Sequence, residues 1–453
     1  MDQHLKEKDI IDITIKKMGI NGEGIGYDQK LAIFVEQALP YEDVKVEIEQ
    51  VFENRAIASI KEILKESKDR KVPFCPVYES CGGCQTQHYD YQKGLDQKRD
   101  MIVQSFDRYI RTNIKSTVVK PTIGADNPLN YRNKASLPIQ KIKGKNYLGM
   151  YARNSNQFIP IESCPIQHEL INQILKTIVS LMDSLGVDGF DHKLKKGYVR
   201  NVVVRVAEHT KEAQVSFIML KKSTRLDDLA QKLIDLEPNV VSVFEVINGD
   251  LKKPGFFTDE IRLIVGEETI SEILNDHEYI LTPEAFFQLN TAQAHKFYLQ
   301  MKRMANLKKH EIAIDAYAGI APVSHYIHMD AKQVYAVEQD PHACESAKLS
   351  LKKNGIQNVS ILQSDFKRAL SGLSEKKIDV MFFDPPRVGL GDDTIKAILK
   401  FKPTRLIYGS CNPSTLAKDL NLLLEHYTLV ETVPLDMFPY TSLVESVSLL
   451  TLK

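Results

Sequence analysis

Three cysteines, Cys75, Cys81 and Cys84, lie within ten residues of one another in a loop that also contains a proline and two glycines. A large intracellular chain does not keep disulfides, so these thiols are expected to be free. The loop can wrap several sulfurs around one centre, and Cys164, which like Cys75 precedes a proline, can supply a fourth. Four thiolates can hold a 4Fe–4S cluster or a zinc ion. Structural zinc usually shows two short cysteine pairs, whereas this chain has one, so the spacing favours the cluster.

A further cysteine and a lone acid occupy positions where covalent chemistry is possible. Cys411 follows an apolar run at the carboxyl end of a predicted strand, where a thiol beside a ligand crevice can act as a nucleophile. A cysteine there can also be a small buried apolar residue, and its position alone favours that interpretation. Glu445 stands in an otherwise apolar final segment, either as a charge at a strand edge or as a buried acid or base.

Acidic residues close several predicted strands in the last third of the chain. Short β-branched runs alternate there with helical stretches, which predicts a parallel, doubly wound sheet with ligands at the carboxyl ends of its strands. The predicted strands lie at 311–317, 333–339, 358–364, 378–384 and 405–410. Glu338 is placed to bind a ribose diol. Residues 315–321 lack the Gly-x-Gly-x-x-Gly cradle for a pyrophosphate, so S-adenosylmethionine, which has no phosphates, fits better than NAD.

The first 70 residues are predicted to be β structure. Apolar or alternating runs of strand length lie at 11–20, 31–35, 44–51 and 56–64, which suggests a small barrel of the oligonucleotide-binding kind. Gly22, Gly24 and Gly26 are interpreted as a hairpin, because no helix pattern follows them. Residues 71–280 are predicted to be mixed, with a helix from about Tyr91 to Asn113.

The net charge of zero hides an uneven distribution. Residues 91–222 contain 22 Lys and Arg against 11 Asp and Glu, whereas residues 223–453 contain 25 against 31. A local cationic excess suits a surface that binds a polyanion, although scattered solvated lysines would give the same count. Tyr131-Arg132-Asn133-Lys134 could stack on a base and hold phosphates, or could be an ordinary exposed turn. No membrane-spanning run or signal peptide is recognisable, so we expect a cytoplasmic protein with no membrane partner.

The motifs together resemble a known family, the bacterial RNA (uracil-5-)-methyltransferases. Within that family the chain looks like the iron–sulfur group of Gram-positive type that modifies 23S ribosomal RNA. The matching segments are Phe287-Gln288-Leu289-Asn290, residues 315–319, Asp384-Pro385-Pro386-Arg387, Ser410-Cys411-Asn412-Pro413 and Val444-Glu445. The cysteine loop and the N-terminal β region, which looks like a TRAM domain, extend the resemblance over nearly the whole chain.

The resemblance implies a multidomain α/β enzyme that forms 5-methyluridine in 23S ribosomal RNA with S-adenosylmethionine as cofactor. Its parts would be a TRAM-like, OB-like β-barrel at 1–70, a central RNA-binding domain with the iron–sulfur loop at 71–280, and a Rossmann-like methyltransferase domain at 281–453. Cys411 would be the nucleophile and Glu445 the proton acceptor. The S-adenosylmethionine pocket would be lined by Gln288, Tyr317, Glu338, Asp365 and Asp384. The 4Fe–4S ligands would be Cys75, Cys81, Cys84 and Cys164. The expected partner is RNA, and the expected state is a monomer.

Two alternatives stay open. The substrate could be a tRNA uridine, although the tRNA-specific relatives generally lack the cysteine loop. The chain could also be a catalytically dead RNA-binding or ribosome-assembly factor. The family usually has Cys-Gly-x-Gly after the aromatic of the first strand, and here residues 318–322 depart from it, so that the methyl of Ala321 and the ring of Pro322 are expected to crowd the cofactor loop. An intact pair of Cys411 and Glu445 argues against decay.

Overall fold

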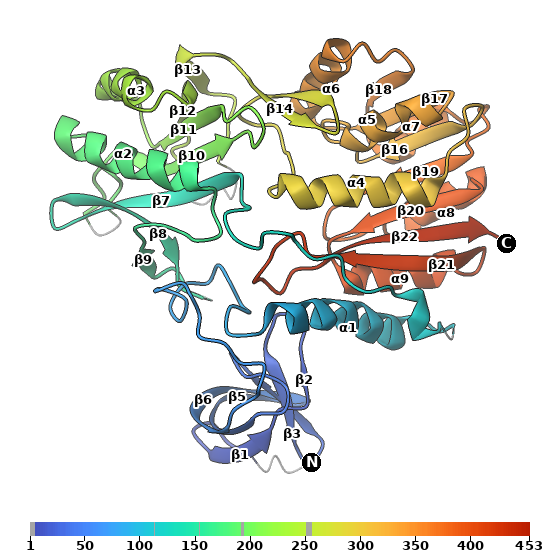
Figure 1. The fold of residues 1–453 in the computed structure, drawn as a ribbon, viewed down its shortest axis with the longest axis horizontal. Coiled ribbons are helices and arrows are strands. Elements are labelled where there is room, and N and C mark those ends of the chain that lie inside the picture. The colour runs from blue at the N-terminus through green and yellow to red at the C-terminus, as the bar shows by residue number, and fades with distance from the viewer. Residues whose placement is uncertain (1–4, 113, 154, 192–193, 251–255) are drawn as a thin grey trace.

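Three β-sheets of six or seven strands each follow one another along the chain in the computed structural model, which describes residues 5–112, 114–153, 155–191, 194–250 and 256–453. Figure 1 shows the N-terminal sheet in blue, the central sheet in green and the C-terminal sheet in orange and red. Each sheet has its own cluster of buried apolar side chains. Among the described residues, no helix combines the length and the hydropathy needed to cross a membrane.

The N-terminal sheet confirms the β structure predicted for this region. Its strands are β1 (Ile10–Thr14), β2 (Lys17–Met18), β3 (Gly24–Asp28), β4 (Leu31–Val35), β5 (Asp43–Phe52) and β6 (Arg55–Lys65), in the order β1-β5-β6-β4-β3-β2. Alternate residues of β5 are fully buried, at Val44, Val46 and Ile48, as the two-residue period of a strand requires. A Cβ at Gly24 would lie 2.7 Å from the Ala38 carbonyl oxygen, so this glycine permits close packing inside the sheet.

The central sheet is covered by two amphipathic helices. Its strands are β7 (Lys134–Ile142), β8 (Lys145–Tyr151), β9 (Phe158–Pro160), β10 (Val199–Val206), β11 (Ala213–Met219), β12 (Val240–Ile247) and β13 (Ile261–Gly266), in the order β13-β12-β11-β10-β7-β8-β9. The helices are α2 (Glu169–Leu185) and α3 (Arg225–Leu236). Buried residues of α2 recur at helical spacing, and α2 ends at Gly186, whose φ of 64° suits a glycine cap. The hairpin of β14 (Ile270–Leu274) and β15 (His277–Leu281) leads to the next sheet.

The C-terminal sheet confirms all five strands predicted for it. Its strands are β16 (Ile312–Ala316), β17 (Gln333–Glu338), β18 (Val359–Gln363), β19 (Val380–Phe383), β20 (Arg405–Ser410), β21 (Tyr427–Leu435) and β22 (Glu445–Leu452). The first five are parallel, and β22 runs antiparallel between β20 and β21. The order β18-β17-β16-β19-β20-β22-β21 reverses direction between β16 and β19, where a doubly wound sheet opens a crevice for ligands.

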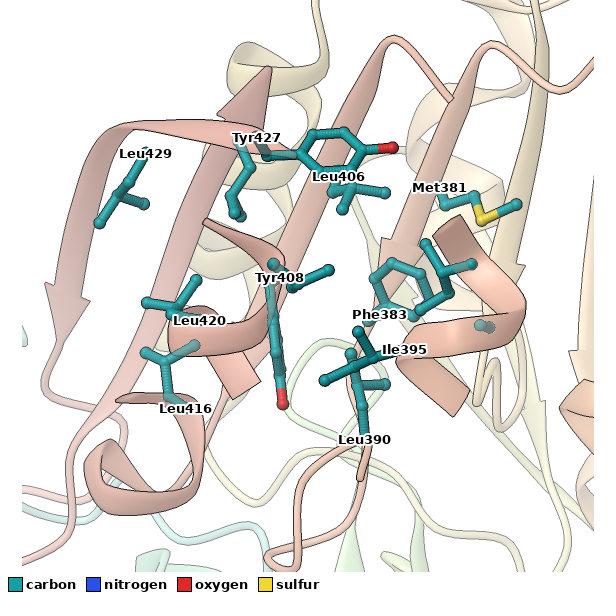
Figure 2. Close-up of a cluster of buried hydrophobic side chains, with 14 of the residues drawn as sticks. Met381, Phe383, Leu390, Ile395, Leu406, Tyr408, Leu416, Leu420, Tyr427 and Leu429 are labelled. Carbon is teal, nitrogen blue, oxygen red and sulfur yellow. The ribbon is translucent and has the colours of Figure 1, made fainter. Parts of the chain in front are cut away.

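Six helices accompany the C-terminal sheet: the first leads into β16, and the other five connect its strands. The six helices are α4 (Thr291–Ala305), α5 (Pro322–Ile327), α6 (Pro341–Lys353), α7 (Phe366–Gly372), α8 (Asp392–Phe401) and α9 (Pro413–Leu423). One large core lies between the sheet and α7, α8 and α9, and Figure 2 shows part of it, with Tyr408 of β20 between Leu416 and Leu420 of α9 and Leu390.

Helix α1 (Tyr91–Tyr109) packs on this C-terminal sheet, although the sequence assigned it to the central unit at 71–280. Its buried residues Met101, Ile102 and Phe106 belong to the core formed by α8, α9 and β20. The chain then runs along β21, where Val119 and Ile123 form parallel bridges. The helix ends at Tyr109, before the predicted end at Asn113, which lies outside the described residues. Residues 91–123 therefore belong structurally to the C-terminal part of the molecule.

Candidate active site

The pairing of two strands brings Cys411 and Glu445 together. β20 and β22 are antiparallel, and their pairing ends with Ser410 opposite Ser446. Cys411 is the first residue after β20 and Glu445 is the first residue of β22, so the register places the two opposite one another. The negative charge of Glu445 accordingly contributes to raising the pKa of the Cys411 thiol. The structure thus unites the two residues expected to carry the chemistry.

Cys411 is held between a strand end and a helix start. The Asn412 side chain caps α9 by accepting a hydrogen bond from the Ser414 amide at 3.0 Å, and Pro413 occupies the first turn, where its missing N–H is harmless. Burial, together with the charges of Glu445 and Asp384, raises the pKa of Cys411 to about 11, although Arg387 opposes them. In the free protein the sulfur is therefore held as a neutral thiol.

Glu445 is a buried carboxyl with charged neighbours of both signs. Burial raises its pKa well above the ordinary value, Asp384 adds to this, and Arg387 and Lys98 oppose it. Asp384 follows β19 at the same sheet edge, and burial raises its own pKa to about 6. An acid in such a site holds a proton firmly once it has taken one, which suits a proton acceptor.

The loop that carries Arg387 is tied to the loop that carries Cys411. The Arg387 carbonyl accepts hydrogen bonds from Asn412 Nδ2 at 3.1 Å and from Thr415 Oγ1 at 3.2 Å. Gly389 has a φ of 81°, and a Cβ there would lie 2.5 Å from a carboxylate oxygen of Asp419. This glycine lets the loop close over α9, which keeps the exposed Arg387 beside the cysteine.

Open space borders the turn after β16, where the cofactor was expected. Gly319 has a φ of 55°, and a Cβ there would meet no atom within 4 Å. Its amide donates to Glu338 Oε2 at 2.8 Å, and Glu338 Oε1 accepts from the amides of Gln339 and Asp340. A carboxylate fixed in this way beside free space fits a ligand with ribose hydroxyl groups, so these residues are compatible with S-adenosylmethionine.

Ala321, where the chain departs from the family's Cys-Gly-x-Gly pattern, has a strained backbone. Ala321 has a φ of 61°, in the left-handed region that favours glycine, and its methyl group is fully buried in a cluster with Ala318, Ala336 and Ala347. Pro322 begins α5, where a proline is tolerated. The carboxylate of Asp315 holds this helix by accepting from the amide and the hydroxyl of Ser324 at 3.0 and 2.7 Å.

The remaining predicted cofactor residues also follow strands of this sheet, except for one. Tyr317 follows β16 and packs against Phe366, with ring centroids 5.8 Å apart. Asp365 follows β18 and caps α7 by accepting from the Arg368 amide at 3.1 Å. Gln288 instead lies, buried, in the loop before α4, a helix that packs on β20 and β22.

The four cysteines of the predicted cluster line one cavity of about 90 Å³. They are Cys75, Cys81, Cys84 and Cys164, and none of them forms a disulfide. Burial, together with the charges of the other three sulfurs, raises the pKa of Cys84 to about 12. Within the part of the chain that the structure describes, no group of three or more His, Cys, Asp or Glu side chains is arranged to hold a metal ion.

The segment Tyr131–Lys134 is not an ordinary exposed turn, because Tyr131 and Asn133 are buried and Arg132 and Lys134 are partly buried; the RNA contact predicted for it stays a prediction. Tyr131 is buried, and its hydroxyl donates to the Pro439 carbonyl at 3.1 Å. Asn133 is also buried, and its Nδ2 donates to the Gln288 carbonyl and to Thr291 Oγ1, each at 2.9 Å. The segment supports the loop that carries Gln288, which explains why its polar side chains face inward.

Neither Lys98 nor Asp436 was predicted from the sequence to belong to the site, and no role was predicted for Arg387. The available signal for Arg387 was its position as the last residue of the Asp384-Pro385-Pro386-Arg387 motif. Lys98 looked like any helix-surface lysine, but it falls on the same face as the buried residues of α1, at the helical spacing 98, 101, 102, 105 and 106. That position on an apolar stripe was the available signal. The sequence around Asp436 contains no such signal, since the burial of this residue depends on the packing of α1 against it.

Comparisons with known proteins agree with this architecture. A family model described as tRNA (Uracil-5-)-methyltransferase matches residues 90–453, and a model described as TRAM domain matches residues 5–61. A protein of Bacillus anthracis named as an uncharacterized RNA methyltransferase is 37% identical over 446 residues, covering 97% of this chain and 96% of its own length. A protein of the same name from Halalkalibacterium halodurans is 38% identical over 450 residues, covering 98% and 97%.

One solved structure shares the fold over nearly the full length. It is the Pyrococcus abyssi tRNA (uracil-54, C5)-methyltransferase in complex with S-adenosyl-L-homocysteine, with a TM-score of 0.78 and 24% sequence identity. The match covers 97% of this chain and 100% of that chain.

Proposed function

The chain belongs to the tRNA (Uracil-5-)-methyltransferase family, and from this premise we propose that it forms 5-methyluridine in 23S ribosomal RNA, with S-adenosylmethionine as methyl donor. The match confirms the predicted family, its TRAM domain and its methyltransferase domain. The observation that carries the proposal is the register of β20 and β22, which sets a cysteine and a buried acid face to face at the edge of the crevice.

Cys411 makes the uracil ring reactive. Carbon-5 of uracil is a poor nucleophile, but addition of the Cys411 sulfur to carbon-6 turns the ring into an enolate whose carbon-5 attacks readily. S-adenosylmethionine supplies, when bound, an electrophilic methyl group. Arg387 is the cation that opposes the raised pKa of Cys411, so it favours the thiolate that this step needs.

Glu445 completes the reaction. The methylated ring still carries a proton on carbon-5, and the carboxylate of Glu445 accepts it. The electron pair of the broken C5–H bond forms the C5=C6 double bond, and the C6–S pair returns to Cys411 as thiolate. Two covalent steps with lower barriers thus replace one direct methylation, whose barrier would be higher. The target base must leave its stack to reach these residues, so a looped or flipped nucleotide is the expected substrate.

We propose that the four cysteines hold a 4Fe–4S cluster. A single zinc ion would need sulfurs converging at about 2.3 Å from one point. The four cysteines line a cavity of about 90 Å³, which offers room for a centre of several atoms. Apolar side chains, among them Leu137, Met150 and Ile161, also line it, which would shield the centre from water.

The cysteine cavity also supports a ribosomal substrate, because the tRNA-specific relatives that the chain resembles generally lack the loop. A tRNA uridine is the second candidate, favoured by the family's name and by the name of the Pyrococcus abyssi enzyme. A catalytically dead assembly factor is disfavoured, because Cys411 and Glu445 meet and the turn at Ala321 is formed despite its strain.

Mass mapping of 5-methyluridine tests the proposal. We expect at least one 5-methyluridine of 23S ribosomal RNA to be missing in cells that lack the gene and to return with the wild-type gene. Complementation with a Cys411→Ala variant should not restore it. Loss confined to tRNA would establish the second candidate, and unchanged 5-methyluridine in both RNAs would contradict the enzyme assignment.

A further inference from the structure

Residues 436–444, between β21 and β22, lead directly into Glu445, and we call them the base loop. The base loop receives hydrogen bonds from parts of the chain far away in sequence. Gln293 and Asn290 of the α4 start donate to the carbonyls of Asp436 and Met437 at 2.9 and 3.1 Å. The amides of Gln85 and Thr86, just after the cysteine loop, donate to the Tyr440 carbonyl at 3.0 and 3.1 Å. The position of Glu445 therefore depends on these outside contacts.

One of these contacts is a buried ion pair. The ammonium group of Lys98, on α1, pairs with the Asp436 carboxylate and also donates to the Phe438 carbonyl at 3.1 Å. The second oxygen of Asp436 accepts from the Tyr91 hydroxyl at 2.8 Å. The side chains of Lys98 and Asp436 are only 6% and 1% exposed. Burying two charges costs several kcal/mol per ion, so such a pair is a poor way to gain stability alone.

The positive charge of Lys98 also acts on Glu445, where it favours the ionised carboxylate. The charged or titratable groups that act on Glu445 are Asp384, after β19, Arg387, in the following loop, and Lys98, on α1, while Cys411 lies opposite. Arg387 is exposed, so water and salt screen its charge. Lys98 is buried under the base loop, so the protein interior, with its low dielectric constant, screens its charge only weakly.

We propose that Lys98 is a positioning residue for the base, which holds the base loop through Asp436 and Phe438 and favours the carboxylate form of Glu445. This inference rests on the proposed function, because it concerns the step in which Glu445 takes the carbon-5 proton of the methylated adduct. Because Lys98 is buried, we expect it to touch neither the RNA nor the cofactor. It acts on elimination alone, whereas attack by Cys411 and methyl transfer precede it.

The test separates these steps. RNA containing 5-fluorouridine traps the covalent adduct, since fluorine cannot leave carbon-5 as a proton does, so trapping reports the steps before elimination. Resolution of the adduct on ordinary RNA, followed in single turnovers across a pH series, reports elimination. Lys98→Met removes the charge, Lys98→Arg keeps it, and Lys93→Met removes an exposed lysine of the same helix as matched control.

Lys98→Met leaves Asp436 buried without its cation, so a double variant Lys98→Met with Asp436→Leu guards against loss of folding. In both variants we expect trapping at the wild-type rate. Resolution should be about tenfold slower at neutral pH, with its pH dependence shifted about one unit to the alkaline side, because Glu445 without Lys98 ionises at higher pH. Lys98→Arg should restore the wild-type profile, and Lys93→Met should not change it.

Two results would overturn the inference. An unchanged pH dependence in the double variant would remove the charge of Lys98 from the mechanism. Equal loss of trapping and resolution, without rescue by Lys98→Arg, would make Lys98 merely structural. Failure of wild-type protein to trap 5-fluorouridine in any ribosomal or transfer RNA would instead overturn the proposed function itself, and this inference with it.

Discussion

Cys411 is a proposed nucleophile held in surroundings that disfavour its reactive form. Burial and two neighbouring acids raise its pKa to about 11, and the one opposing cation, Arg387, lies in an exposed loop. The free protein therefore keeps the sulfur as a thiol, which is a poor nucleophile and is slow to oxidise. Activation then has to come with the RNA, which can exclude water around Arg387 and strengthen its effect on the sulfur.

The reactivity of this thiol should depend steeply on pH. In the free protein, alkylation of Cys411 should speed up throughout the neutral and mildly alkaline range, because the thiolate fraction grows until the pH reaches the pKa of about 11. Quantitative mass spectrometry of the peptide that contains Cys411 measures the alkylation rate across a pH series. A rate that levels off near pH 8.5, about the ordinary pKa of cysteine, would contradict the environment described here.

Removal of the nucleophile should separate catalysis from binding. Cys411→Ala should lower methyl transfer by at least about a thousandfold, while RNA affinity changes little, because the sulfur forms a bond during the reaction and contributes little to binding. Incorporation of labelled methyl groups and a filter-binding assay measure the two quantities. Adduct formation with 5-fluorouridine RNA in the alanine variant would show that another residue attacks the ring.

Glu445→Gln should block the second half of the reaction. Glutamine keeps the shape of the side chain but cannot accept the proton, so the methylated adduct should accumulate on Cys411 and not resolve. Denaturing gel electrophoresis of protein incubated with RNA and cofactor would show the covalent band. Turnover near the wild-type rate in this variant would exclude Glu445 as the base.

At the scale of elements, most strands of the first sheet and the five parallel strands of the last sheet could be predicted, because each is a short apolar run bounded by turn residues. The location of α1 in the fold could not be predicted. Its sequence shows a buried face but not which sheet that face covers, and the partners of Met101 and Phe106 lie hundreds of residues away on α8, α9 and β20. The exposure of Tyr131 and Asn133 was mispredicted for the same reason, since their burial arises from tertiary contacts with the base loop and Gln288.

The site could be predicted only in part. Strand ends and motifs identified Cys411, Glu338 and Asp384, because the carboxyl ends of parallel strands meet at one edge. That Glu445 faces Cys411 depends on the antiparallel insertion of β22 beside β20, a register that no local pattern encodes. The residue roles proposed for the cofactor pocket and for the cysteines stay predictions that await the experiments.

The cysteine loop should carry iron. Protein purified without oxygen should be brown and contain about four irons per chain, because four thiolates around one cavity suit a 4Fe–4S centre. Cys84→Ser, at the most buried of the four, should lose both the colour and the iron, whereas Cys344→Ser, on α6, should keep them. Absorption spectra and metal analysis measure this, and stoichiometric zinc in anaerobic protein would contradict it.

For the whole molecule, the cationic excess of residues 91–222 is smaller at the surface than the sequence suggests. Lys98 and Arg205 are buried, and Arg205 serves the protein by donating to the carbonyls of Thr282 and Ala285. Cations and aromatic rings that are at least partly exposed instead gather on the central sheet, near the start of β10. The Lys221 ammonium lies 5.0 Å from the Tyr198 ring centroid. Arg200, two residues further along, acts on the pKa of Tyr151, a half-exposed tyrosine of β8.

This basic and aromatic patch, of Tyr151, Tyr198, Arg200 and Lys221, is where we expect the central domain to contact RNA. Its rings can stack on unpaired bases, and its cations can neutralise phosphates. Arg200→Ala together with Lys221→Ala should weaken RNA binding and reduce the slope of log affinity against log salt by about 1.5, because two phosphate contacts are lost. S-adenosylmethionine binding should not change, since the strand ends of the C-terminal sheet are untouched. Lys348→Ala with Lys352→Ala, two exposed lysines on α6 at the other side of Figure 1, provides the matched control, and an equal loss of affinity in that pair would show only a general effect of charge.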